Sequence, residues 1–144
     1  MFDNFLFYDE YYPDDDKKYF GQIMASHVFQ SQVNNLTWFA GYLTAEGSSY
    51  SGKVHSTVFL YSYCTALTLQ NGEYTTGDYG NYNFDEEVFN RYADTDITMF
   101  RLNGENSPFS EEIQGYGIFN GRTTDYCQYI ILVKNSEAET ELGN

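Results

Sequence analysis

Residues 53–69 have the sequence KVHSTVFLYSYCTALTL, and the predicted fold depends mainly on this stretch. One side of the extended chain is small, as at Ser62 and Cys64. The other side holds rings such as Phe59 and Tyr61, so the pattern has a period of two residues. Val, Thr, Phe and Tyr fit a pleated surface, and the run contains no Gly or Pro that would break it. We therefore predict one long central β-strand, at least half buried on both faces.

The chain before this strand gives mixed signals. Residues 4–12 predict an opening strand, which Pro13 ends. Three Asp residues at 14–16 suit a helix N-terminus, where carboxylates cap free N–H groups and meet the positive end of the helix dipole. A helix over about 15–31 is therefore predicted. Residues 20–33 nevertheless stay open between helix and strand, because their apolar side chains keep no clean 3.6-residue period.

The rest of the chain predicts strands, turns and one short helix. Asn71-Gly72 is the strongest turn signal, because Asn and Gly accept the positive φ angles of a type I′ turn that folds residues 73–75 back. Residues 77–83 are rich in turn formers and predict a loop. Residues 84–92 predict a short helix with acidic residues in its first turn. Strands are expected at 34–46, 96–102, 113–119 and 125–133, with the last two forming a hairpin.

These elements predict an α+β fold, a mostly antiparallel β-sheet with one or two helices packed on a face. A length of 144 residues suits one domain, which is large enough to bury about two thirds of its unfolded surface. We place this single globular domain at residues 1–134. Residues 135–144 are acidic and almost free of apolar side chains, so a disordered tail is expected there.

The charge of the chain is strongly one-sided. There are 21 Asp and Glu against 7 Lys and Arg, and the formal net charge is -14 at pH 7. Disordered acidic proteins usually have few aromatic residues, whereas Phe, Tyr and Trp make up 19% of this chain, which favours a folded domain. The N-terminus lacks the basic region of a signal peptide, and no apolar run reaches the ~20 residues that span a bilayer. We therefore expect a cytoplasmic protein without membrane contact.

Catalytic, metal and cofactor sites find little support in the sequence. His27 and His55 have no acidic or thiol neighbour at triad or metal-ligand spacing. The Asp clusters at 14–16 and 94–96 do not continue into a twelve-residue calcium loop with its bidentate Glu. There is no glycine-rich phosphate loop or dinucleotide fingerprint, so we predict no enzyme, no metal and no cofactor. Paired carboxylates for glycoside cleavage stay open, since their geometry is set in three dimensions.

The two cysteines, Cys64 and Cys127, both fall in predicted strands. They would pair only if these strands were neighbours, and two cysteines in a chain of this length do not make a disulfide framework. Free Cys commonly behaves as a small buried hydrophobic residue. Free thiols are therefore favoured, with a disulfide as the alternative.

The charge predicts a kind of partner rather than a reaction. Lys and Arg dominate contact with phosphates, so the excess of acid disfavours direct binding of nucleic acid. Conversely, carboxylates interleaved with Tyr can occupy the basic groove that a nuclease or other nucleic-acid-binding protein offers to phosphate. We therefore expect an acidic inhibitor, a nucleic-acid mimic that binds a basic protein. Its predicted partner-binding residues are Asp9, Glu10, Tyr12, Asp14, Asp15, Asp16, Glu73, Asp78, Tyr79, Tyr82, Asp85, Glu86, Glu87, Asp94 and Asp96.

Other interpretations of this surface stay open. The acidic residues can form a solvated surface that only keeps the protein in solution. An assembly protein could use its sheet edges in an oligomer. A carbohydrate or another polar ligand could stack on exposed rings, for which the candidates are Trp38, Tyr74, Tyr79 and Tyr82.

In size and charge the chain resembles two groups of small acidic proteins. These are inhibitors that phages make against host defence and immunity proteins made against nuclease toxins. The first resemblance implies action in the cytoplasm of a host cell. The resemblance covers composition, has no motif and transfers no residue.

Overall fold

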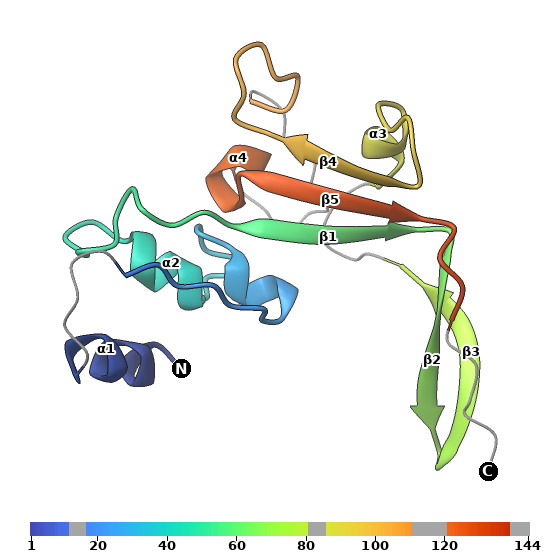
Figure 1. Ribbon diagram of the computed structural model, residues 1–144, viewed down its shortest axis with the longest axis horizontal. Coiled ribbons are helices and arrows are strands. Elements are labelled where there is room, and N and C mark those ends of the chain that lie inside the picture. Colours follow the sequence, from blue (N-terminus) through green and yellow to red (C-terminus); the bar gives the residue numbers. More distant parts are fainter. Residues whose placement is uncertain (12–16, 81–85, 111–120, 139–144) are drawn as a thin grey trace.

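The computed structural model describes residues 1–11, 17–80, 86–110 and 121–138, which fold into strands and short helices (Figure 1). The strands are β1 (Thr57–Ser62), β2 (Cys64–Gln70), β3 (Glu73–Tyr79), β4 (Ile97–Arg101) and β5 (Tyr129–Lys134). The helices are α1 (Phe2–Tyr11), α2 (Phe39–Thr44), α3 (Glu86–Asn90) and α4 (Thr123–Tyr126), with a 3₁₀-helix, η1 (Ala25–Val28). The predicted α+β class is confirmed.

A three-stranded sheet in the order β1-β5-β4 forms the centre of the fold. β5 is parallel to β1 and antiparallel to β4, while β2 and β3 form a separate antiparallel pair. One face of the sheet is buried: Ile130 and Leu132 of β5 are fully enclosed, and Val58 and Leu60 of β1 lie beside them in register. The ring of Phe89 from α3 joins this cluster. Tyr126 of α4 belongs to it as well, and each such buried side chain contributes about 1.5–3 kcal/mol, so the cluster holds α3 and α4 to the sheet.

The long strand predicted for residues 53–69 is broken at Tyr63. Its φ angle of 54° is a left-handed conformation that costs a non-glycine residue about 1–2 kcal/mol. β1 therefore ends at Ser62, and β2 turns away from the three-stranded sheet to pair with β3 alone (Figure 1). The prediction of one continuous strand is wrong because the alternation of side chains continues through this corner without a Gly or Pro to mark it.

Two segments predicted as strands contain helices. The first segment, residues 4–12, lies mostly in α1. The ring centroids of Phe5 in α1 and Phe39 in α2 are 5.6 Å apart. Residues 34–46 contain α2, which turns Leu43 into the interior. Segments this rich in aromatic side chains fit periods of both two and 3.6 residues, and the packing of α1 against α2 decides for the helix.

The helix predicted over residues 15–31 is limited, within the described residues, to the single turn of η1. The choice left open for residues 20–33 is thus resolved as one 3₁₀ turn within irregular chain. A tight turn that was not predicted follows at Asn34 and Asn35, whose φ angles are 52° and 61°. Residues 14–16, with the Asp cluster, lie outside the described ranges.

The hairpin turn predicted at Asn71-Gly72 is confirmed. Both residues have positive φ angles, 53° and 88°, and the two strands pair without interruption from Gln70 opposite Glu73. The prediction of a loop beginning at residue 77 is wrong, because β3 continues to Tyr79. Its pairing with β2 extends further than the turn-forming composition indicates.

The helix predicted at residues 84–92 and the strand predicted at 96–102 are confirmed as α3 and β4. The strand predicted at 125–133 starts only at Tyr129, because α4 occupies the residues before it. The strand predicted at 113–119, and its hairpin with the last strand, lie outside the described residues.

Cys64 and Cys127 are both free and buried, as the favoured alternative predicts. Burial raises the pKa of Cys127 to about 12, because the apolar surroundings penalise the thiolate.

At the other end of β5, the chain continues beside the start of β2. There the Asn135 N–H donates to the carbonyl of Ser62 at 3.1 Å, and the Thr65 N–H donates to the carbonyl of Ser136 at 2.9 Å.

Candidate partner-binding surface

The β2–β3 hairpin, residues 64–79, projects away from the three-stranded sheet (Figure 1). Every residue of β3 is exposed, and β2 passes from buried Cys64 to exposed residues at the turn. Apolar rings and chains remain in solvent here: Tyr74 is 57% exposed and Leu69, directly opposite it, is 62% exposed. The hairpin therefore presents two accessible faces.

Each face of the hairpin carries one carboxylate and one tyrosine. Pairing across the ladder places Asp78 on the same face as Tyr74, because residues of one strand alternate between faces. Glu73 and Tyr79 share the opposite face for the same reason. The segment from Cys64 to Tyr79 contains no Lys or Arg, so no positive charge within it offsets these two acids.

The hairpin is held mainly by its own pairing and by contacts at its foot. The hydroxyl of Thr68 donates to the carbonyl of Thr75 across the ladder at 3.2 Å. At the foot, the rings of Tyr61 and Tyr79 meet edge to face with centroids 4.9 Å apart. Ala138 N–H donates to the hydroxyl of Thr65 at 2.8 Å, which ties the C-terminal segment to the start of β2.

The remaining described acidic residues of the predicted surface lie on other elements. Glu10 is exposed on α1, Glu87 on α3, and Asp94 and Asp96 just before β4. The Asp96 carboxylate accepts a hydrogen bond from the side chain of Asn135 at 3.0 Å. α1 and the hairpin lie at opposite ends of the molecule (Figure 1), so Glu73, Asp78 and Tyr79 share the hairpin without α1, with Asp78 on the face opposite to Glu73 and Tyr79. Glu86 begins α3, and the residues outside the described ranges are Tyr12, Asp14, Asp15, Asp16, Tyr82 and Asp85.

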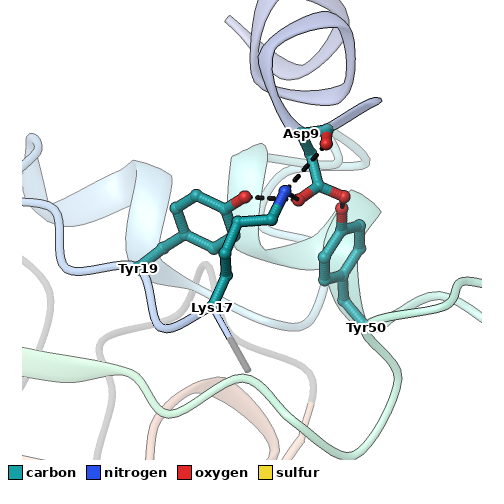
Figure 2. A network of polar contacts seen from close by, with 4 residues as sticks. All are labelled: Asp9, Lys17, Tyr19 and Tyr50. Carbon is teal, nitrogen blue, oxygen red and sulfur yellow. Dashed lines mark hydrogen bonds and ion pairs between the residues drawn. The ribbon is translucent and has the colours of Figure 1, made fainter. Parts of the chain in front are cut away.

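Asp9 is engaged within the molecule (Figure 2). The ammonium of Lys17 donates to Asp9 Oδ1 at 2.9 Å and to the Asp9 carbonyl at 2.8 Å. The hydroxyls of Tyr19 and Tyr50 donate to Oδ1 and Oδ2 of the same carboxylate. Both carboxylate oxygens are thereby occupied, and the last turn of α1 is tied to two later segments of the chain.

These contacts shift the titration of the groups involved. Hydrogen bonds from Tyr19, Tyr50 and Lys17 stabilise the ionised carboxylate and hold the pKa of Asp9 well below its usual range. The hydrogen bond to Asp9 raises the pKa of Lys17. Desolvation, and then the bond to Asp9, raise the pKa of Tyr50 to about 12. No local pattern in the sequence predicts this network, because its residues come from three separate segments of the chain.

A groove of about 500 Å³ lies between the start of α1 and the segment around α2. Its lining residues are Met1, Phe2, Asp3, His27, Thr37, Trp38, Phe39 and Tyr42. The Trp38 indole N–H is buried and has no hydrogen-bond partner among the described residues. The His27 ring packs edge to face against the Trp38 ring, with centroids 5.0 Å apart. Trp38 directly precedes α2, whereas Tyr74 and Tyr79 belong to β3 of the projecting hairpin, so these residues come from different parts of the fold (Figure 1).

Comparisons with protein-family models, with curated proteins and with solved structures found no match to this chain. Among the described residues, no group of three or more His, Cys, Asp or Glu side chains is placed to hold a metal ion. Within the same ranges, no helix has the length and apolar character needed to cross a membrane. The features that bear on function are thus the hairpin, the groove and the uneven charge.

Proposed function

We propose that this protein binds a basic partner, such as a nuclease or another nucleic-acid-handling effector, and that the β2–β3 hairpin enters the groove in which the partner holds phosphate. The observation that carries the proposal is the hairpin itself. It projects from the body, exposes a carboxylate and a tyrosine on each face, and has no basic residue between Cys64 and Tyr79. The protein would thereby inhibit its partner by excluding the nucleic acid.

Physical chemistry favours this pairing over direct contact with nucleic acid. A net charge of -14 repels phosphate but speeds the approach of a basic protein, because the attraction acts before contact. Tyrosine is enriched among residues that contribute most binding energy, since its ring buries a large area and its hydroxyl can still pair. Tyr74 and Tyr79 would supply such anchors, while Glu73 and Asp78 would take the positions of phosphates.

The proposal is tested by nuclease inhibition and by binding at two salt concentrations. The purified chain is mixed with a panel of purified basic nucleases, and cleavage and affinity are measured at about 0.05 M and about 0.5 M NaCl, which span short and long Debye lengths. We expect inhibition of at least one enzyme and weaker binding at high salt. Absence of inhibition across the panel, or binding that ignores ionic strength, contradicts the proposal.

A matched pair of variants locates the contact. Glu73→Lys with Asp78→Lys reverses both hairpin acids, whereas Glu46→Lys with Glu105→Lys makes the same change in net charge at exposed positions elsewhere. We expect the hairpin variant to lose roughly tenfold or more in affinity, or about 1.4 kcal/mol, and the control to lose less. Equal losses would mean that binding follows total charge and that the hairpin is not the contact.

The groove beside Trp38 favours a second candidate function, the binding of a small polar ligand such as a sugar. The buried Trp38 N–H could donate to a ligand oxygen, and the aromatic lining could stack on a sugar ring. Because Trp38 is the only tryptophan, its fluorescence reports this groove alone. Titration with a panel of monosaccharides and oligosaccharides should shift or quench its emission, and unchanged emission throughout the panel removes this candidate.

A further inference from the structure

The outer face of the three-stranded sheet is apolar and open to solvent. Register places Phe59 of β1, Ile131 of β5 and Met99 of β4 in one row across this face. Met99 is 66% exposed and Phe59 is 47% exposed, and Ile97, on the same face of β4, is 68% exposed. The opposite face of the same strands forms the core, so both faces of this sheet carry apolar side chains, but only one of them is buried.

None of the described strands pairs with the outer edge of β4. Lys134 N–H donates to the Asp96 carbonyl at 2.7 Å, and Leu102 N–H donates to the Gln128 carbonyl at 2.9 Å. Hydrogen-bonded pairs alternate in an antiparallel ladder, so Thr98 and Phe100 also bond toward β5. The backbone groups of the intervening residues, Ile97, Met99 and Arg101, must therefore point away from β5.

These outward groups have one partner within the described residues. It is the hydroxyl of Thr95, which donates to the Ile97 carbonyl at 2.7 Å. Proteins usually protect such an edge with a proline, a lysine or a bulge. β4 reads Ile-Thr-Met-Phe-Arg and pairs with β5 without interruption, so it has none of these devices. As far as the described residues go, the edge is thus open to pairing with another strand.

Charge along the strand indicates which strand fits. Asp94 and Asp96 stand just before β4, and Arg101 ends it, so the edge is negative at its start and positive at its end. All three residues are exposed. A second copy of β4 laid antiparallel places the Arg101 of each copy near the acidic start of the other. A parallel copy would instead bring like charges together.

We propose that two copies of this protein pair through antiparallel β4 strands about a two-fold axis near Met99. The three-stranded sheets then join into one continuous sheet, and their apolar outer faces become contiguous. No residue of the hairpin takes part, so this inference is independent of the proposed binding of a basic partner. Two chains of charge -14 repel each other at long range, so salt should strengthen the dimer while weakening contact with a basic partner.

The test measures the mass of the 144-residue chain in solution. Sedimentation velocity and light scattering across a concentration series, in about 0.15 M NaCl, should show a reversible monomer–dimer equilibrium that shifts toward dimer as salt is added. A chain that stays monomeric at protein concentrations up to about 1 mM, the Kd of a very weak complex, overturns the proposal. So does a larger assembly, because a two-fold pairing closes at two copies.

Lysine substitutions separate the edge from the open face. Met99→Lys places a charge at the centre of the proposed pairing and should weaken dimerisation roughly tenfold or more. Phe59→Lys makes the same charge change on the same face but two strands away, and should weaken it less. Circular dichroism confirms that both variants are folded. Equal loss in both variants would mean that copies associate through the face, which contradicts edge pairing.

Charge exchange tests the antiparallel direction. Arg101→Glu should weaken the dimer because it makes both ends of the strand acidic. Adding Asp94→Lys and Asp96→Lys to that variant restores opposite charges with their order reversed, and should recover the dimer. The same residues in a parallel pairing would give no recovery, so a triple variant as weak as Arg101→Glu overturns the proposed geometry.

Discussion

The hydroxyl of Tyr50 donates a hydrogen bond to the Asp9 carboxylate across 41 positions of the chain. This bond connects the last turn of α1 to the loop after α2, and the bonds from Lys17 and Tyr19 connect it to the segment before η1. The rings of Phe5 and Tyr50 lie 5.3 Å apart beside it, so polar and aromatic contacts hold α1 at the same place.

The Asp9 network predicts that α1 is released in acid. The folded pKa of Asp9 lies below its unfolded value of about 4, so its stabilising effect is complete above that pH and is lost as pH falls toward the folded pKa. Trp38 shares a groove with the start of α1, so its emission should change in this acidic range. Asp9→Asn should produce the change already at neutral pH, whereas Glu10→Gln, one residue away, should behave as the native protein. A native-like emission in Asp9→Asn at pH 7 contradicts this account.

The corner at Tyr63 predicts an order of stability among substitutions. Tyrosine already bears the cost of a φ of 54°, and β-branched isoleucine tolerates it less well, so Tyr63→Ile should lower the free energy of unfolding by a further amount of about 1 kcal/mol. Asparagine accepts this conformation, and Tyr63→Asn should be close to neutral. Urea denaturation measures both, with Tyr74→Ile as the control, because it removes another exposed tyrosine from an ordinary strand position. If the two isoleucine variants lose the same stability, the backbone at residue 63 is not the cause.

The hairpin turn predicts a local effect without a global one. Gly72 has a φ of 88° and open space around it, so Gly72→Ala adds only backbone strain, of about 1–2 kcal/mol. Hydrogen exchange should accelerate in β2 and β3 while the amides of β5 keep their protection. Gly80→Ala provides the control, since this glycine also has open space but no positive φ. Faster exchange throughout β5 in the Gly72 variant would show that the hairpin supports the core.

The buried thiols predict reactivity that depends on unfolding. Cys64 and Cys127 are both free and buried, and the raised pKa of Cys127 leaves almost no thiolate at pH 8. Titration with a thiol reagent should find almost no fast-reacting group in the native protein and two in urea. A chain whose thiols remain blocked in urea until a reductant is added would contain the disulfide that the structure lacks.

Local signals explain which elements the sequence could predict. Asn71-Gly72 determines its own turn, and the alternation of β4 and the acidic start of α3 need no distant partner. Tyr63 carries no such mark, since its left-handed backbone has neither Gly nor Asn to announce it. The segments of α1 and α2 were predicted wrongly, as strands, for another reason. Their aromatic residues fit two periods, and only the contact between the helices selects one.

The candidate site was predictable in its composition and not in its arrangement. The place of Glu73 follows from a recognisable turn, whereas Asp78 and Tyr79 were expected in a loop and lie instead at the end of β3. The engagement of Asp9 depends on where Tyr50 lies, and no pattern near either residue contains that information. The parallel pairing of β1 with β5 joins segments about 70 positions apart, beyond the reach of any local rule.

The sharp corner after β1 separates the strands that form the buried core from the strands that form the exposed hairpin. Beyond the buried Cys64, the residues of the hairpin bond mainly to one another, so exchanging the exposed side chains toward its turn should leave the interior of the protein undisturbed. Substitutions on the exposed strands should therefore change what the hairpin can touch without altering the architecture of the sheet that carries it.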